Sequence, residues 1–315
     1  MAETILSLRG IRRRYPGPGG VPVDILDGID LDIEAGQTLG LVGESGCGKT
    51  TLGRAIMLLP PPDEGQVILE GTDLTTLTSR QLRAVRPRIQ MVFQDPVSSL
   101  NPKRTIFESI IAPLQLHARL TRAEQTAQAN AMIEAVGLDP ALIGARYPHE
   151  LSGGQCQRAS IARALVLQPR VLVCDEPVSS LDVSIQSQIL NLLLDSQRRF
   201  ALTLLFIAHD IAVVRYISDR IAVMYQGQVC EVLPSATLVE QAIHPYTRLL
   251  LDSIPGQGSS DAQSANETHS TPRGVSEAGC RFRHRCPIAT SRCAVETPRL
   301  REIRPGHFVA CHNLD

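Results

Sequence analysis

Short apolar runs alternate with amphipathic stretches along the first 250 residues of the chain. Runs with the length of buried strands occur at 38–43, 88–93, 170–175, 202–209 and 220–225. Helical periodicity fills the intervals, as in 122–138, in 155–167 and in the apolar positions that follow residue 50. Strands separated by helices predict an α/β fold with a mostly parallel sheet covered on both faces. The run 67–71 predicts a strand of an antiparallel edge region.

The pattern changes after residue 254. The stretch 255–279 is rich in Ser, Gly, Ala and Thr and has almost no large apolar side chains, which predicts a linker. The last segment, 280–315, has too few apolar residues for a hydrophobic core of its own, so it needs another source of stability. We therefore expect a large domain over 1–254, a linker over 255–279 and a small extension over 280–315.

The composition of the chain limits its possible partners and its cellular location. The net charge of −1 over 315 residues gives no general attraction to nucleic acid, and we expect no nucleic-acid partner. The basic run 12–14 is interpreted as a solvated face. No apolar run reaches about 18 residues, and the first residues lack the layout of a signal peptide, so we expect a cytosolic chain. Cysteines before residue 255 are dispersed and are expected to be free thiols.

A glycine-rich stretch carries the clearest chemistry. "GESGCGKT" at 43–50 fits G-x-x-x-x-G-K-[ST] between an apolar strand and an amphipathic helix, the context of a phosphate-binding loop. Its backbone N–H groups would face phosphate oxygens, Lys49 would lie between the β- and γ-phosphates, and the Thr50 hydroxyl would ligate Mg²⁺. The nucleotide-binding candidates here are Gly43, Glu44, Ser45, Gly46, Cys47, Gly48, Lys49, Thr50 and Thr51. Cys47 is interpreted as a small residue in a tight turn.

A second strand ends in two carboxylates, in "VLVCDEP" at 171–177. Asp175 at the strand tip would hold Mg²⁺ through water. Glu176, one residue further, would polarise the water that attacks the γ-phosphate, the positioning role that phosphoryl transfer requires. Two carboxylates after a strand are a weak signal alone, but the preceding phosphate loop strengthens it.

The stretch "LSGGQCQR" at 151–158 resembles the signature motif of ATP-binding cassette (ABC) ATPases. Ser152 can cap the following helix, and Gly153 and Gly154 leave backbone N–H groups bare, which makes a second anion site with Gln155. The resemblance implies a P-loop NTPase-type fold with a helical subdomain at about 95–165. It also implies two subunits paired head to tail, so that each signature closes on the partner's nucleotide. Cys156 stands where the family usually has a longer polar or basic side chain.

The resemblance assigns further positions in the order that the family has them. Tyr15 would stack on adenine, and Gln94 would sense Mg²⁺ and water at the end of its strand. Asp182 in "SSLD" would lie in the loop that crosses the dimer interface. His209 would contact the γ-phosphate and the catalytic glutamate. The resemblance thus implies Glu176, His209 and Gln94 as catalytic residues, and Thr50, Gln94 and Asp175 as the Mg²⁺ site.

Several stretches look like the peptide and nickel importer branch, above all "SLNP" at 99–102 and "HPYT" at 244–247. That likeness implies an ATPase subunit that powers peptide uptake, with nickel or another small solute as the alternative. It implies two separate permease subunits, an extracytoplasmic substrate-binding protein, and a homologous ATPase partner in a heterodimer or a homodimer. The protein would be peripheral, at the cytoplasmic face of the inner membrane.

Two other functions are alternatives to the importer hypothesis. Soluble cassette proteins of DNA repair or translation typically carry a long coiled-coil insertion or two cassettes, and this sequence has neither. A redox- or metal-sensing regulatory ATPase would give the cysteine tail the main role.

That tail has four cysteines, Cys280, Cys286, Cys293 and Cys311, without the C-x₂-C knuckles typical of structural zinc. Four thiolates on loops can surround a metal centre. The tail resembles the C-terminal extension of peptide-importer ATPases, which implies a [4Fe–4S] cluster whose negative charge Arg281, Arg283 and Arg285 would offset. Zinc with His284, His307 or His312, and plain reduced cysteines, remain the alternatives.

Overall fold

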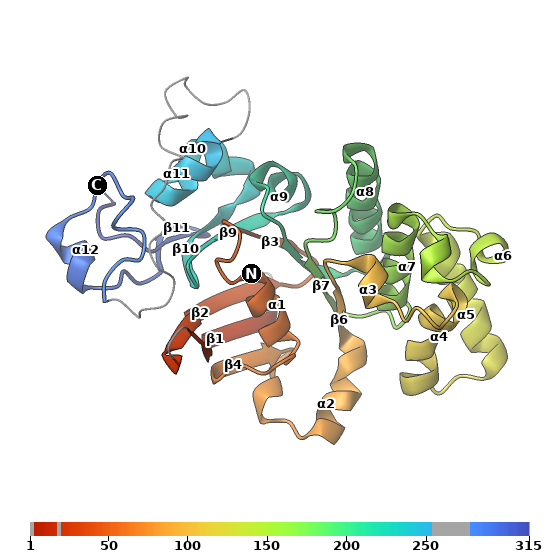
Figure 1. Cartoon of the computed structure of the whole chain (residues 1–315). Coiled ribbons are helices and arrows are strands. Elements are labelled where there is room, and N and C mark those ends of the chain that lie inside the picture. Colours follow the sequence, from red (N-terminus) through yellow and green to blue (C-terminus); the bar gives the residue numbers. More distant parts are fainter. Residues whose placement is uncertain (1–2, 18–19, 254–277, 315) are drawn as a thin grey trace. The chain divides into compact units, whose positions relative to one another are not determined.

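The computed structural model describes residues 3–17, 20–253 and 278–314, and Figure 1 traces them. The linker predicted at 255–279 lies, except for its last two residues, outside the described residues. The chain forms two compact units. Unit 1 contains Glu3, Glu34–Gly36 and Thr76–Leu205. Unit 2 contains the described parts of Thr4–Ile33, Gln37–Thr75 and Phe206–Asp315.

Unit 2 contains an antiparallel sheet. Its strands run in the order β2 (Pro22–Glu34), β1 (Thr4–Pro16), β4 (Glu64–Leu69) and β5 (Thr72–Asp73), and Figure 1 shows β1, β2 and β4 side by side. β1 pairs with β4 so that Leu6 faces Leu69 and Leu8 faces Val67, all four of them buried. Burying the apolar face of each strand fixes this register, because a slip of one residue would expose it. The antiparallel region expected around 67–71 is therefore present as β4.

Unit 2 also contains a parallel pair that leads into the phosphate loop. β3 (Thr38–Val42) lies parallel to β9 (Arg220–Tyr225), with Leu41 opposite Ala222. Helix α1 (Lys49–Ile56) follows the loop, and α9 (Ile211–Ile217) packs on β3. Gly40 permits this packing, because a Cβ there would lie 2.2 Å from a Val214 methyl carbon.

The C-terminal extension joins this part of the molecule. β10 (Gln228–Pro234) pairs with β9, and β12 (His307–Val309) pairs antiparallel with β10 and with β11 (Arg301–Arg304). Three helices belong to the same region: α10 (Leu238–Gln241), α11 (Pro245–Asp252) and α12 (Ser291–Val295). Although it has few apolar residues, the extension gains order by adding strands to an existing sheet.

Unit 1 joins a parallel strand pair to a group of helices. β6 (Ile89–Val92) lies parallel to β7 (Val171–Asp175), and β8 (Thr203–Ile207) spans the point where unit 1 gives way to unit 2. The helices are α2 (Ser79–Val85), α3 (Pro96–Ser99), α4 (Ile106–His117), α5 (Arg122–Ala135), α6 (Pro140–Ile143), α7 (Gly153–Leu165) and α8 (Val183–Phe200). Capping boxes begin α2, α4, α5 and α7, which explains where these helices start.

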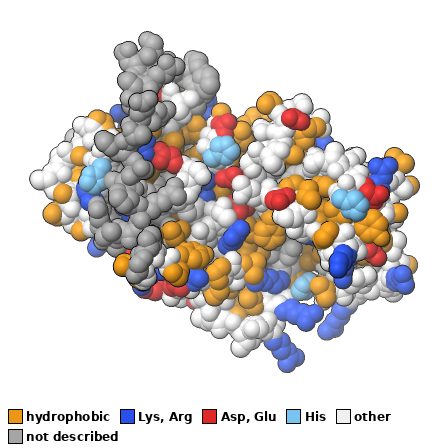
Figure 2. Space-filling view, in the orientation of Figure 1, with side chains coloured by type: hydrophobic (Ala, Val, Ile, Leu, Met, Phe, Trp, Pro, Cys, Tyr) orange, Lys and Arg blue, Asp and Glu red, His pale blue; other side chains and the backbone are white. Residues whose placement is uncertain are grey.

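Within the described part of the chain, short 3₁₀ turns span Leu74–Thr76, Arg86–Arg88, Pro148–Glu150 and Ser235–Thr237. The strands and helices together confirm the expected α/β class. Among the described residues, no helix combines the length and the apolar composition that a membrane crossing requires. Acidic, basic and hydrophobic side chains are interspersed on the face drawn in Figure 2.

Candidate nucleotide site

The phosphate loop, residues 43–50, connects β3 to α1 in unit 2. Gly46 and Gly48 have φ angles of 76° and 110°, in a region that side chains with a Cβ rarely adopt. Gly43 is needed for space, because a Cβ there would lie 2.1 Å from the carbonyl oxygen of Met224. The glycines therefore allow the backbone to curl tightly in front of the first turn of α1, where the helix dipole favours an anion.

Lys49 stabilises the tight backbone turn of the phosphate loop. Its Nζ donates to the carbonyl oxygens of Gly43, at 2.7 Å, and Glu44, at 3.0 Å, and the side chain is only 4% exposed. The neighbouring Cys47 is also buried, and its burial raises the pKa of the thiol although Lys49 acts to lower it. Cys47 is thus a well-packed residue of the loop.

Two other predicted nucleotide contacts belong to the same unit. Tyr15 is the last residue but one of β1 and has the Arg13 guanidinium 5.0 Å from its ring centroid, so a cation–π contact supports one face of the ring. His209 follows β8 and is exposed. The preceding Ala208 N–H donates to the Leu41 carbonyl at 3.1 Å, which places the end of β8 beside the strand that leads into the phosphate loop.

Unit 1 carries the acidic pair. Asp175 ends β7 and is 1% exposed, whereas Glu176 leaves the strand with a φ of 45°, unusual for a residue with a side chain. The Nε2 of Gln94 donates to the Glu176 carboxylate at 3.1 Å. The structure therefore brings together Gln94 and Glu176, two of the three residues predicted to be catalytic, at the carboxyl ends of the parallel strands β6 and β7.

The predicted signature residues form a capped helix start, also in unit 1. The Gln155 N–H donates to the Ser152 hydroxyl at 3.3 Å, and the Gln155 side chain accepts from the Ser152 N–H at 3.0 Å. Gly154 lies against α8, because a Cβ there would be 2.9 Å from a methyl carbon of Ile185. Asp182 is the N-cap residue of α8, and its carbonyl oxygen accepts from the N–H groups of Ile185 and Gln186.

A family model described as "ABC transporter" matches residues 26–179, which include the phosphate loop, the signature helix and the acidic pair. A putative peptide import ATP-binding protein of Brucella ovis is 47% identical over 317 residues, which cover 99% of this chain and 98% of that protein. The chain belongs to the ATP-binding subunits of ABC transporters. As a member of this ATP-hydrolysing family it is an ABC ATPase, which confirms the resemblance drawn from its motifs.

Other comparisons agree. The oligopeptide transport ATP-binding protein AppF of Bacillus subtilis is 44% identical to this ABC ATPase and covers 98% of it, and the match spans 97% of AppF. Dimeric MJ0796 bound to ADP and Pi superposes with a TM-score of 0.67 at 29% identity, over 73% of this chain and 99% of that chain. CbiO1 from Clostridium perfringens gives 0.67 at 26% identity, over 76% and 92%. A second family model, "Oligopeptide/dipeptide transporter, C-terminal region", matches residues 230–293.

The metal centre predicted for the cysteine tail of the ABC ATPase is supported only in part. The Cys280 N–H donates to the Cys293 carbonyl at 2.8 Å, and the charges of Cys286, Cys293 and Cys311 contribute to raising the pKa of Cys280, although burial contributes most. The four thiols therefore gather in one region and provide a donor set that suits iron–sulfur chemistry. Yet within 3–17, 20–253 and 278–314, no group of three or more Cys, His, Asp or Glu side chains is arranged to hold a metal ion.

The arginines of the tail were expected to offset the charge of a metal cluster, but two of them bind carboxylates elsewhere in unit 2. Arg281 pairs with Asp27 at 2.6 Å, and Arg285 pairs with Glu44 at 2.8 Å. Arg283 donates to the carbonyl oxygens of Ala278 and Cys280. The contacts that Tyr246 and Arg285 make with Glu44 were not predicted from the sequence. Both residues lie in stretches that the sequence singles out, 244–247 and 281–285, but no local pattern there indicates Glu44 as the partner.

Cys156, the departure from the usual signature region, is fully buried, and its Sγ donates to the Pro148 carbonyl at 3.3 Å. A longer basic side chain would not fit this position as it is packed here. The substitution therefore acts inside unit 1 and leaves the cap formed by Ser152 and Gln155 in place.

Proposed function

We propose that this ABC ATPase powers the import of peptides through separate permease subunits. The observation that carries the proposal is the match of residues 230–293 to the C-terminal region of oligopeptide/dipeptide transporters, a region outside the motifs that all cassettes share. Relatives named as peptide import and oligopeptide transport proteins, similar over nearly the whole chain, support it.

Each unit carries some of the residues that we propose bind and hydrolyse ATP. In unit 2, the loop 43–51 would bind the phosphates through backbone N–H groups, Lys49 would neutralise them, and Tyr15 would stack on adenine. In unit 1, Glu176 would orient the attacking water and Gln94 would hold the Glu176 carboxylate by the observed hydrogen bond. His209 would contact the γ-phosphate and Glu176.

Mg²⁺ suits the oxygen donors of this set, Thr50, Asp175 and Gln94. The ion would supply positive charge between the β- and γ-phosphates. The buried Asp175 would hold it at the end of β7.

Coupling requires partners. Ser152, Gly153, Gly154, Gln155 and Asp182 would meet the nucleotide held by a second, homologous ATPase, in a heterodimer or a homodimer. The helices between residues 95 and 165 would pass closure to two permease subunits, and an extracytoplasmic binding protein would deliver the peptide. The ATPase would act as a peripheral protein on the cytoplasmic face of the inner membrane.

Uptake by intact cells tests this proposal. Cells that carry Glu176→Gln in place of the native chain should lose accumulation of a labelled peptide pool, while the variant remains in the membrane fraction with its permease subunits. Labelled nickel, supplied with a chelator, serves as the competing substrate. Loss of nickel uptake with normal peptide uptake would overturn the peptide assignment and favour the nickel alternative.

We further propose a [4Fe–4S] cluster on Cys280, Cys286, Cys293 and Cys311, with zinc as the runner-up. The gathering of four thiols in one region supports it, but their sulfur atoms would have to converge further than they do in the structure. Anaerobically purified protein should contain about four iron atoms per chain and be brown, Cys286→Ser should lose the iron, and Cys156→Ala, altered in unit 1, should keep it. A colourless protein with one zinc ion, or with no metal, would refute the cluster.

A further inference from the structure

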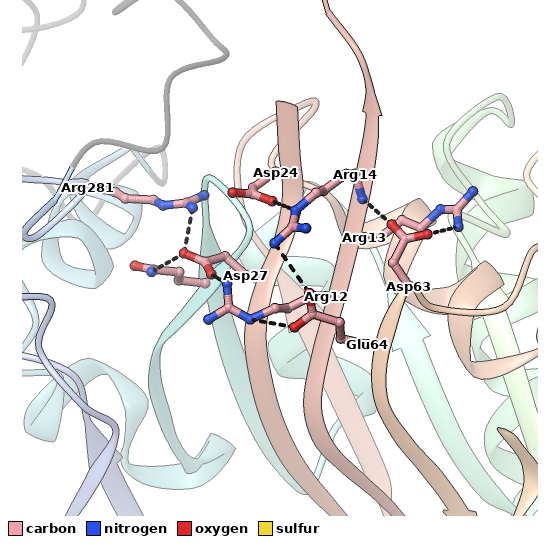
Figure 3. Close-up of polar contacts among 9 residues, drawn as sticks. Arg12, Arg13, Arg14, Asp24, Asp27, Asp63, Glu64 and Arg281 are labelled. Carbon is pink, nitrogen blue, oxygen red and sulfur yellow. Dashed lines mark hydrogen bonds and ion pairs between the residues drawn. The ribbon is translucent and has the colours of Figure 1, made fainter. Parts of the chain in front are cut away.

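The C-terminal extension is anchored to the rest of unit 2 directly after Cys280. The Arg281 guanidinium pairs with the Asp27 carboxylate at 2.6 Å, as Figure 3 shows, and also donates to the Gln226 carbonyl. Asp27 further accepts from Arg12, at 2.6 Å, and from Gln228, at 3.0 Å. Because Arg281 and Asp27 are both largely buried, this cluster ties the extension to β1, β2 and β10 in a fixed place.

The next residue, Phe282, is a buried aromatic anchor. Its ring is 2% exposed and meets Tyr225 edge-on, with the ring centroids 5.2 Å apart, and Tyr246 with the centroids 5.4 Å apart. Such contacts among large aromatic side chains restrict the position of the backbone beyond what area burial alone would do. The start of the extension is therefore held by packing as well as by charge.

Three residues further on, Arg285 reaches the phosphate loop. Its Nη1 contacts both carboxylate oxygens of Glu44, at 2.8 and 3.1 Å. The same guanidinium lies 5.7 Å from the Phe282 ring centroid and 5.9 Å from that of Tyr225. The packed aromatic pair thus orients the arginine toward the loop.

Glu44 is the second residue of the phosphate loop, and each of its polar groups has a partner. The N–H donates to the buried Tyr246 hydroxyl at 2.8 Å, the carbonyl oxygen accepts from Lys49, and the carboxylate binds Arg285. Two of these three contacts come from residues beyond the motif. The entry of the loop is therefore held, at its N–H and at its carboxylate, by residues from outside the motif.

We propose that Arg285 is a positioning residue for ATP binding, which fixes the entry of the phosphate loop through Glu44. A loop already held in its binding geometry loses less conformational entropy when the nucleotide binds, so the contact raises affinity. The C-terminal extension thereby acts on the ATP site whether or not it carries a metal. The inference rests on the proposed role of loop 43–50 as the phosphate site.

Equilibrium ATP binding by the purified full-length protein tests this inference. Arg285→Ala should raise the Kd for ATP about twofold to fivefold, as expected for a partly exposed ion pair. Arg285→Lys should recover part of the loss, and the wild-type advantage over Arg285→Ala should shrink at high salt because the pair is screened. Arg283→Ala, which alters a neighbouring arginine of the extension, is the matched control and should bind as the wild type does.

The pair itself is tested by a double-mutant cycle. Glu44→Gln and Arg285→Ala should be non-additive in Kd, with the double variant no weaker than the weaker single variant. In the assembled transporter, Arg285→Ala should raise the KM for ATP and leave kcat unchanged, because a preorganised loop favours ground and transition states equally.

Thermal unfolding of each variant separates positioning from stability. If Arg285→Ala binds ATP as tightly as the wild type while Lys49→Ala abolishes binding, the phosphate site stands and the positioning role fails. A rise in Kd that Glu44→Gln does not share, or one explained by a large drop in Tm, would also overturn it. If Lys49→Ala binds ATP normally, the proposed phosphate site itself is wrong.

Discussion

The side-chain amide of Gln94 donates a hydrogen bond to the Glu176 carboxylate at 3.1 Å, across the parallel strands β6 and β7. This contact orients the one carboxylate that leaves β7 in a left-handed backbone conformation. We expect Glu176→Gln to lower kcat for ATP hydrolysis by at least about 10²-fold, because it removes the group that polarises water. ATP binding should persist, which equilibrium binding and single-turnover hydrolysis will check. Retained turnover would exclude Glu176 as the catalytic carboxylate.

Gln94→Ala should have a smaller effect of the same kind. Without the amide, the Glu176 side chain loses one orienting hydrogen bond, worth about 1 kcal/mol, so kcat should fall about fivefold to tenfold. Steady-state hydrolysis at saturating ATP measures it. Gln90→Ala is the matched control, because Gln90 lies on β6 and its amide donates to the carbonyl of Arg86, in the 3₁₀ turn that precedes the strand.

Gly43→Ala should abolish ATP binding without unfolding the protein. The added Cβ would lie 2.1 Å from the Met224 carbonyl oxygen, so the loop entry must shift away from β9. Nucleotide titration, with circular dichroism to follow the fold, checks this expectation. Normal ATP affinity would show that the loop adapts and that its observed curl is not required.

His244 gives the fold a defined sensitivity to acid. The ring is 2% exposed, burial lowers its pKa to about 4, and its Nδ1 accepts from the Tyr246 N–H at the start of α11. In the unfolded chain the His244 ring takes up a proton near pH 6.5, but in the folded chain only near pH 4. The contribution of this ring to the free energy of unfolding is therefore fully present above about pH 6.5 and is lost as the pH falls from there toward 4. The loss from this group should reach about 3 kcal/mol.

His244→Asn isolates the contribution of this ring, because asparagine keeps an acceptor for the helix N-cap but does not titrate. Denaturant unfolding between pH 7 and pH 4.5 should show a shallower decline for the variant than for the wild type. Parallel declines would refute the assignment.

The local backbone features of the candidate nucleotide site could be predicted from the sequence. The phosphate loop, the carboxylates after β7 and the capped signature helix each occupy a few consecutive residues, so their geometry is encoded locally. Buried parallel strands were also predictable, since they are continuous apolar runs. The family comparisons confirm the class that these motifs indicate.

Long-range pairings could not be predicted in this way. The run Arg12–Arg14 was interpreted as a solvated face, and its side chains do remain partly exposed. What the sequence did not indicate is that they pair with Asp27, Asp63, Asp24 and Glu64, from three other parts of unit 2 (Figure 3). Likewise, Arg285 lies 241 positions from Glu44. A charge shows its partner only once the strands and the extension have been brought together.

Peptide import driven by ATP hydrolysis is the function assigned to this ABC ATPase. It is tested most directly by ATP hydrolysis in lipid vesicles that contain the purified complex as proposed, with two ATPase subunits, two permease subunits and the binding protein. We expect peptide-loaded binding protein to stimulate hydrolysis and peptide entry together, and Glu176→Gln to abolish both. Hydrolysis that is indifferent to peptide, or stimulated only by another solute, would contradict it.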